Sequence, residues 1–149
     1  MSLNDVGVIC SALILVAMGC GRKEVKPVDI FPEDNCSNCR MAVSERAFAS
    51  EIIVESGEVM KFDDLACLEQ FRRKNPDLNI DEIFVTDHET GQWLPYKKSV
   101  VVKTGLQTPM GSGKIAVADS NRARAVAVQY PPAQDPSEAQ VPVAAGRLR

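Results

Sequence analysis

The pattern of hydrophobic and polar positions divides the middle of the chain into short strands and two helices. Strands are expected at 48–55, 58–62, 83–86, 92–96, 99–103 and 114–118, and helices at about 64–74 and 120–130. Asp63 or Asp64 is expected to cap the first helix and Ser120 the second, because their side-chain oxygens accept the free N–H groups at a helix start. This mixture of strands and helices indicates an α+β protein.

A faint internal repeat runs through these elements. The segments Val59–Asp64 (VMKFDD) and Ile115–Ser120 (IAVADS) both read as a strand, an aspartate and the start of a helix. Two copies of one unit would make the α+β fold a pair of small β-β-α-type lobes packed together behind a tether. The alternative is that turns from strand to helix simply favour aspartate as a cap, in which case the likeness has no structural meaning.

The N-terminal end has the character of a targeting segment. Residues 1–19 contain an apolar run, Val6 to Gly19, which is too short to span a bilayer comfortably and predicts a signal peptide. Small residues then lead into Cys20, whose thiol is the expected acceptor of a lipid. Two features depart from the usual lipoprotein signal: no Lys or Arg precedes the apolar run, and Ala17 stands where Leu is usual. The alternative is a buried N-terminal helix with an incidental cysteine.

The expected organisation follows from these compositional changes. It consists of a signal peptide at 1–19, a lipidated tether at 20–33, a folded domain at 34–130 and a disordered tail at 131–149. The tail holds four of the nine prolines and shows no hydrophobic period. A lipid anchor would place the domain outside the cytoplasm.

Composition narrows the chemistry that the domain can perform. The net charge of −3 argues against nucleic acid as a partner. The chain has one histidine, which excludes sites that need several imidazoles, such as a three-histidine zinc enzyme. Any chemistry must therefore come from sulfur or from carboxylates.

Two cysteines share one tight turn in the segment Cys36-Ser37-Asn38-Cys39. Two thiols at this spacing can bind one soft metal ion, close a small disulfide or exchange disulfides with another protein. A structural zinc site normally takes four ligands, and here Cys67 and His88 would have to complete it. The spacing alone leaves these alternatives open.

Cys67 and Met110 are two further candidate ligands. Cys67 is expected near the start of the first helix, where free N–H groups and the helix dipole favour a thiolate, and at the edge of the apolar face, which suggests partial access. A small buried hydrophobic residue is the other interpretation. Met110 lies in the loop Thr108–Gly113 (TPMGSG), where a methionine has little core to fill and its thioether is free for a soft metal such as Cu(I).

Four segments, taken in order, give a resemblance to a known family. They are Asp34–Met41 (DNCSNCRM), Lys61–Asp64 (KFDD), Asp87–Trp93 (DHETGQW) and Thr108–Gly113 (TPMGSG). Behind a lipoprotein signal, this order resembles the NosL-type lipoproteins, the accessory proteins of nitrous oxide reductase. One position departs from the family pattern, because Arg40 stands where the family usually has glycine before the methionine. Arg40 places a positive charge beside the thiols, which favours thiolates, and restricts the backbone there.

The resemblance implies a fold, a function and a set of ligands. It implies two lobes similar to those of organomercurial lyase, and a non-enzymatic protein that is lipid-anchored on the periplasmic side of a bacterial membrane. Its expected role is delivery of Cu(I) to nitrous oxide reductase or another copper enzyme, in concert with a membrane transport complex. The resemblance carries over two candidate clusters of ligands. The first consists of Cys36, Cys39 and Met41, and the second of Met110, approached by Cys67 and by Asp63 at the helix start.

Two other classes of function are compatible with the same residues. A thiol-disulfide oxidoreductase would use Cys36 and Cys39 as an active pair, although no thioredoxin-like β-α-β pattern surrounds them. A non-catalytic anchored binding domain would use the same pair as a structural disulfide. Copper binding by the reduced thiols separates both from the metallochaperone hypothesis.

Overall fold

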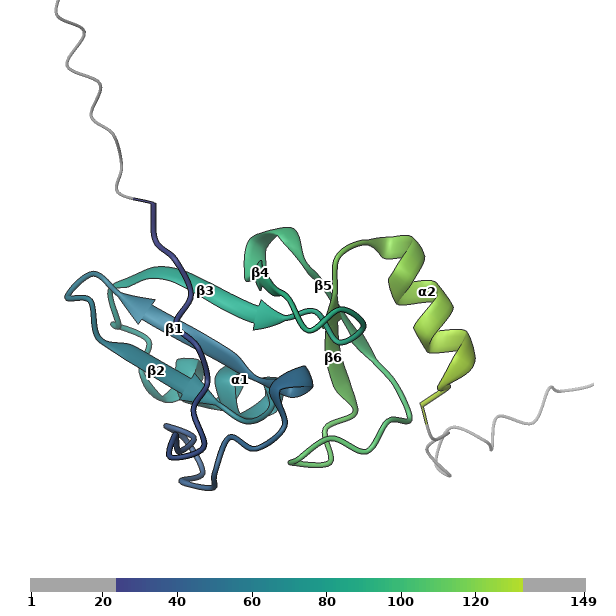
Figure 1. Ribbon diagram of the computed structural model, residues 1–149, viewed down its shortest axis with the longest axis horizontal. Coiled ribbons are helices and arrows are strands. Elements are labelled where there is room, and N and C mark those ends of the chain that lie inside the picture. The colour runs from purple at the N-terminus through teal and green to yellow at the C-terminus, as the bar shows by residue number, and fades with distance from the viewer. Residues whose placement is uncertain (1–23, 133–149) are drawn as a thin grey trace, which may run out of the picture.

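The computed structural model describes residues 24–132 of the chain. The expected signal peptide, Cys20 and all but the first two residues of the expected tail lie outside the described residues. Two antiparallel sheets and two helices form an α+β fold, which confirms the fold class predicted from the sequence (Figure 1). Within the described range, no helix has the length and apolar character needed to cross a membrane.

The first lobe is larger than the expected β-β-α unit. It contains β1 (Ser50–Val54), β2 (Val59–Phe62), α1 (Leu65–Lys74), β3 (Ile80–Thr86) and β4 (Trp93–Pro95), with a short 3-10 turn on either side, η1 (Arg46–Phe48) and η2 (Tyr96–Lys98). The strand order is β2-β1-β3-β4, and every neighbouring pair is antiparallel. Helix α1 lies on one face of this sheet, while the N-terminal segment crosses the other (Figure 1). The strands after α1 thus extend the first sheet.

The second lobe is a β-β-α unit of the expected size. It consists of β5 (Val100–Lys103), β6 (Lys114–Val117) and α2 (Ser120–Gln129), which pack around a small separate core. The two lobes meet where Asp87 forms a bridge with Ala116 and the backbone N–H of His88 donates to the Ala116 carbonyl at 2.9 Å. The two sheets are therefore joined at the end of β3.

Both helices begin at an aspartate in extended backbone conformation. Asp64 caps α1 by accepting a hydrogen bond from the N–H of Ala66, and Asp119 caps α2 by accepting from the N–H groups of Asn121 and Arg122. The expectation that Ser120 caps the second helix is wrong, since Ser120 is the first helical residue. Aspartate at position 119 already satisfies the free donors of the first turn, which leaves the serine hydroxyl no capping role.

The C-terminal part of the expected tether, residues 20–33, covers the outer face of the larger sheet, which is the face opposite α1. The N–H of Val28 donates to the Glu51 carboxylate at 2.9 Å, and the Lys61 ammonium donates to the Asp29 carbonyl at 2.6 Å. Glu51 is completely buried beneath this segment, and burial raises its pKa to about 7. Burial by itself would raise the pKa of Asp34, the residue after the segment, but the hydrogen bond and positive charge of Lys61 and the hydrogen bond from the Phe31 N–H together lower it.

Candidate metal site

The Cys36–Cys39 turn is fastened to the start of the first lobe by backbone hydrogen bonds. The N–H of Arg40 donates to the Cys36 carbonyl at 2.9 Å, and the N–H of Cys36 donates to the Met41 carbonyl at 2.7 Å. The N–H of Ser37 donates to the Lys61 carbonyl on β2 at 2.8 Å. The turn is thereby held against β2, directly before the point where the chain enters α1.

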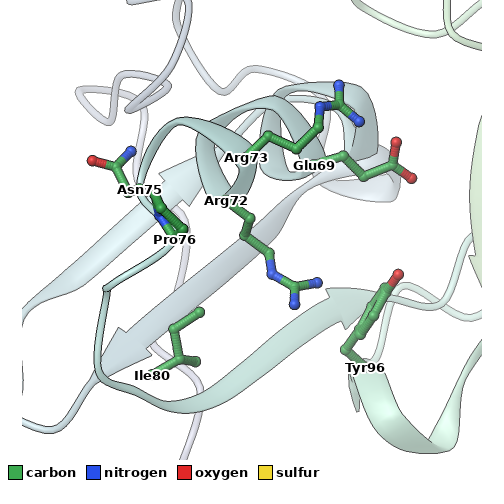
Figure 2. Close-up of a pocket in the computed structure, with 7 residues that line it drawn as sticks. All are labelled: Glu69, Arg72, Arg73, Asn75, Pro76, Ile80 and Tyr96. Carbon is green, nitrogen blue, oxygen red and sulfur yellow. The ribbon is translucent and has the colours of Figure 1, made fainter.

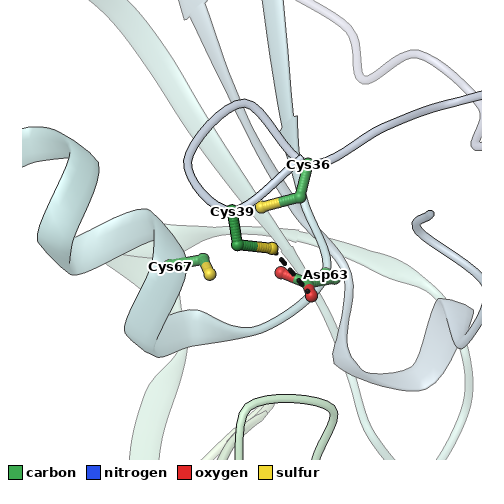
Figure 3. Close-up of side chains that lie close together, drawn as sticks. All are labelled: Cys36, Cys39, Asp63 and Cys67. Carbon is green, nitrogen blue, oxygen red and sulfur yellow. Dashed lines mark hydrogen bonds between the residues drawn. The ribbon is translucent and has the colours of Figure 1, made fainter. Parts of the chain in front are cut away.

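The structure brings three cysteines and one aspartate together at this point (Figure 3). Cys36 and Cys39 come from the turn, Asp63 from the junction between β2 and α1, and Cys67 from the first turn of α1. One ligand atom from each residue lies within 4.8 Å of the others, and the Cys39 thiol donates to the Asp63 carboxylate at 3.4 Å. The thiols that the sequence divides between two candidate clusters therefore form one.

The chemistry of this cluster suits a cation. Cys36 and Cys67 are completely buried and Asp63 is 1% exposed, so solvent reaches the group mainly at the half-buried Cys39. Asp63 Oδ1 has no hydrogen-bond partner among the described residues. A buried carboxylate oxygen without a partner is costly unless a donor or a cation satisfies it. Sulfur and oxygen ligands that already converge give an ion a prepared binding place.

Two of the three thiols, Cys39 and Cys67, have a raised pKa, which favours their neutral form. Burial raises the pKa of Cys39, and the neighbouring Asp63 and Cys36 raise it further. Burial also raises the pKa of Cys67, despite its place in the first turn of α1. The expected partial access and thiolate character of Cys67 are therefore wrong. Desolvation outweighs the hydrogen bonds that favour the thiolate, which come from the Met41 backbone at Cys39 and from the Asn38 side chain at Cys67. The thiolate expected beside Arg40 is therefore not favoured at Cys39.

Asn38 is a residue of the site that sequence reasoning did not single out. Its side-chain amide donates to Cys67 Sγ at 3.5 Å and to Gln70 Oε1 at 3.2 Å, and its oxygen accepts from the Lys74 ammonium at 2.9 Å. These contacts link the middle of the cysteine turn to three positions along α1. Asn38 therefore fixes the distance between the paired thiols and Cys67.

Arg40 adopts the backbone conformation that glycine adopts most easily. Its φ is +68°, the only positive φ of a non-glycine residue in the described range. A side chain in the left-handed region costs free energy that glycine avoids. Arginine therefore occupies a backbone position that glycine would adopt at lower cost, at the point where the sequence departs from the pattern that it resembles.

The two candidate methionines lie on segments next to the cluster. Met41 lies two residues after Cys39 and is 48% exposed, and Met110 is 41% exposed in the loop between β5 and β6. The backbone N–H of Met110 donates to Asp64 at 3.0 Å, which brings its loop to the start of α1. His88, needed for the zinc alternative, lies instead against Phe48, with ring centroids 5.1 Å apart, and is not a member of the cluster.

Asp63 has a larger part in the cluster than the sequence indicates. The sequence associates it only with Met110 and Cys67, whereas in the structure it accepts a hydrogen bond from the Cys39 thiol. The signal available was the pair of aspartates before α1, because one aspartate is enough to cap a helix. The second is free for another purpose.

An open hollow of about 520 Å³ lies elsewhere, between the C-terminal part of α1, the start of β3 and η2 (Figure 2). Its lining residues are Glu69, Arg72, Arg73, Asn75, Pro76, Ile80 and Tyr96. Figure 2 shows the Arg72 side chain extending from the helix toward Tyr96. None of the four cluster residues lines this hollow.

Comparison with known proteins identifies the family. The sequence model of the NosL family matches residues 27–131. The chain belongs to the NosL family. A solved structure, described as the crystal structure of the copper chaperone NosL from Shewanella denitrificans, aligns with a TM-score of 0.63 at 19% identity, over 70% of this chain and 87% of that one. At that identity the likeness shows a common fold. A comparison with curated proteins finds no significant match.

Proposed function

We propose that this NosL-family protein is a membrane-anchored, periplasmic metallochaperone that carries Cu(I). The observation that supports this most directly is the cluster of three thiols and one carboxylate within 4.8 Å. The structurally similar Shewanella protein is described as a copper chaperone. The recipient would be nitrous oxide reductase or another copper enzyme, served together with a membrane transport complex, as the family resemblance implies.

The ligand types favour a soft monovalent ion. Thiolate and thioether sulfurs select Cu(I) over hard cations such as Mg²⁺ or Ca²⁺. Three thiols provide sulfur within the cluster, and Met41 and Met110 lie on the adjoining segments. Zinc also accepts a set of three cysteines and one aspartate, so a direct competition between the two metals is part of the test.

The burial of the ligands is compatible with both retention and release. Cys36 and Cys67 are completely buried, whereas Cys39 keeps part of its surface accessible. An incoming ligand from a recipient protein would reach the ion most directly at Cys39. Transfer would then begin by exchange at that sulfur while the buried thiols still hold the ion.

The anchor would hold the domain close to the membrane. We propose that residues 1–19 are removed as a signal peptide and that Cys20 carries the lipid. Because the Val28 N–H is bonded to Glu51 of the sheet, at most the eight residues from Cys20 to Pro27 would separate the lipid from this contact. At about 3.5 Å per extended residue, the domain would stay within about 30 Å of the bilayer surface.

The decisive experiment measures Cu(I) binding by the full-length protein, reduced and without oxygen, against a chromophoric Cu(I) chelator. One tightly bound Cu(I) per chain is expected. Cys67→Ala should weaken binding by at least about tenfold, because it removes a sulfur ligand. Arg122→Ala is the matched control, since Arg122 is the third residue of α2, as Cys67 is of α1. It should leave affinity unchanged.

Three outcomes contradict the proposal. They are absence of tight Cu(I) binding by the reduced protein, unchanged affinity in Cys67→Ala, and retention of Zn(II) in preference to Cu(I). Oxidation to a disulfide between Cys36 and Cys39 should abolish most of the binding, because a disulfide supplies no thiolates. Equal binding before and after oxidation would favour a site away from this pair.

A further inference from the structure

Asp64 makes more hydrogen bonds than a helix cap requires. Its Oδ1 accepts from the Ala66 N–H and from the Ser112 hydroxyl, both at 2.7 Å. Its Oδ2 accepts from the Thr108 hydroxyl at 2.6 Å and from the Met110 N–H at 3.0 Å. Only the bond from Ala66 belongs to α1. The other three come from the loop of the second lobe that carries Met110.

The equivalent aspartate of the second lobe provides a reference for an ordinary cap. Asp119 accepts from Asn121 and Arg122 of its own helix, and its carboxylate contacts no loop of the other lobe among the described residues. Asp119 is exposed, whereas Asp64 is completely buried. The bonds that distinguish Asp64 are therefore all directed at the Met110 loop.

The loop is shaped to fit this carboxylate. Gly111 and Gly113 have φ values of +64° and +65°, a conformation in which other residues are strained. The N–H of Gly113 donates to the Thr108 hydroxyl at 3.2 Å, and the N–H of Lys114 donates to the Ser112 hydroxyl at 3.1 Å. The hydroxyls of Thr108 and Ser112 thus each accept a hydrogen bond from a backbone N–H and donate one to Asp64. These bonds fix the loop from Thr108 to Ser112 against the carboxylate.

Asp64, which holds the loop, is also bonded to the backbone that carries the cluster residues Asp63 and Cys67. Asp64 directly follows Asp63, and its carbonyl accepts a hydrogen bond from the Cys67 N–H at 3.0 Å. The Met110 N–H and the Cys67 N–H are therefore bonded to the same residue. This arrangement brings the backbone of Met110, in the loop of the other lobe, to the residue that directly follows Asp63 of the cluster.

We propose that Asp64 is a positioning residue of the metal site, which fastens the loop so that the Met110 thioether joins the cluster in holding the ion. This inference rests on the proposed function, because it needs Cu(I) at the cluster. Asp64 itself does not touch the ion. Its role is to keep the Met110 loop of the second lobe in place. The loop then lies over the buried thiols and supplies the Met110 thioether as one more ligand.

The test is a double-mutant cycle on Cu(I) affinity in the full-length reduced protein. Asp64→Asn keeps a capping residue but removes the charge that accepts the loop donors. It is expected to weaken Cu(I) binding by about tenfold, as supporting residues around metal ligands commonly do. Met110→Ala should weaken binding to a similar degree, and the double variant should be no weaker than Met110→Ala alone. X-ray absorption at copper should show one sulfur fewer in each single variant.

Controls separate positioning from folding. Asp119→Asn makes the same change at an ordinary cap and should leave Cu(I) affinity unchanged. Ser112→Ala removes one of the three ties between the loop and Asp64 while keeping the α1 cap, and should cause a smaller loss of affinity that also disappears when Met110 is replaced. This variant keeps the test decisive if Asp64→Asn fails to fold.

The outcomes distinguish the inference from the function beneath it. If the unmodified protein binds no Cu(I), the proposed function fails. If it binds Cu(I) but Met110→Ala has no effect, or if Asp64→Asn weakens binding equally with and without Met110, the proposed positioning role is wrong and the metallochaperone proposal stands. An unchanged sulfur count in Asp64→Asn also overturns the inference.

Discussion

The two strand–aspartate–helix units of this chain share a backbone design and differ in chemistry. In the first, β2 leads through Asp63 and Asp64 into α1, and in the second, β6 leads through Ala118 and Asp119 into α2. The φ values of the two caps are −152° and −151°, and each helix has ten residues. The geometry that starts a helix after a strand is therefore nearly the same in both lobes.

Two pairs of equivalent positions differ in chemistry between the units. Asp63 corresponds to the exposed Ala118, and Cys67, the third residue of α1, corresponds to the exposed Arg122 of α2. Both residues of the first unit are buried. The cysteine turn, tied to β2 and α1, covers these positions in the first unit. Burial under that turn, rather than the helix start itself, turns one copy into a candidate metal site.

The strongest contrast in stability is expected at the strand ends that precede the two caps. Phe62, the last residue of β2, is completely buried, and its ring centroid lies 5.2 Å from that of Phe71. Phe62→Ala should lower the free energy of unfolding by about 3–5 kcal/mol, because it leaves a large cavity. Val117→Ala, at the corresponding position of β6, removes less volume and should cost about 2 kcal/mol.

Urea unfolding followed by circular dichroism measures both values. Equal losses from the two variants would contradict the view that the first unit carries the main core. Cu(I) affinity provides a second measurement, since Phe62 directly precedes Asp63. A loss of affinity in Phe62→Ala but not in Val117→Ala would locate the metal site in the first unit independently of its ligands.

Sequence patterns predicted the elements of this fold better than their grouping. Alternation and capping residues indicated all six strands and both helices, because these signals are local. The addition of β3 and β4 to the first sheet depends on pairing between distant segments, such as Ser50 with Val85, which no local pattern encodes. The mistaken cap at Ser120 shows that neighbouring polar residues compete for one role.

The three cysteines of the cluster were predicted as candidate ligands, but their arrangement was not. Roles for Met41 and Met110 as ligands stay predictions. The sulfur residues were recognised by type and spacing, which are visible in the sequence. That Cys67 joins Cys36 and Cys39 depends on the cysteine turn packing against α1 through Asn38, a tertiary contact. The raised pKa values of Cys39 and Cys67 follow from burial, which also cannot be deduced from helix position alone.

The two strand–aspartate–helix units also differ in their neighbouring strands, which are β1 beside β2 and β5 beside β6. Glu51 of β1 lies opposite Lys61, whereas the corresponding pair of the second sheet is Val101 and Ala116. The pKa of Glu51 is raised to about 7, so the folded state prefers its protonated form. The resulting stability is present below the usual pKa near 4.5 and is lost as the pH rises through 7.

Replacing this carboxylate should remove that pH dependence. Glu51→Gln should match the unmodified protein near pH 4 and exceed its free energy of unfolding by about 2 kcal/mol near pH 8. Glu55→Gln, just beyond the end of β1 at an exposed position, is the matched control and should change little. Urea unfolding at several pH values measures the difference. If Glu51→Gln is destabilising at pH 8, the ionised carboxylate is instead stabilised by Lys61 and the Val28 N–H.

The smallest effect is expected at Arg122, the position in α2 that corresponds to Cys67. Its Nε donates to Glu89 at 2.6 Å, but the arginine side chain is 55% exposed, so solvent screens the pair. Arg122→Ala should lower the free energy of unfolding by no more than about 0.5 kcal/mol, and less at high salt. Unfolding at low and high salt measures this, with Arg124→Ala, also exposed on α2, as the control. If Arg122→Ala lowers the free energy of unfolding as much as a core truncation does, Arg122 is buried or bound to several charged groups in solution. The contrast between the buried Cys67 and the exposed Arg122, each the third residue of its helix, would then not hold.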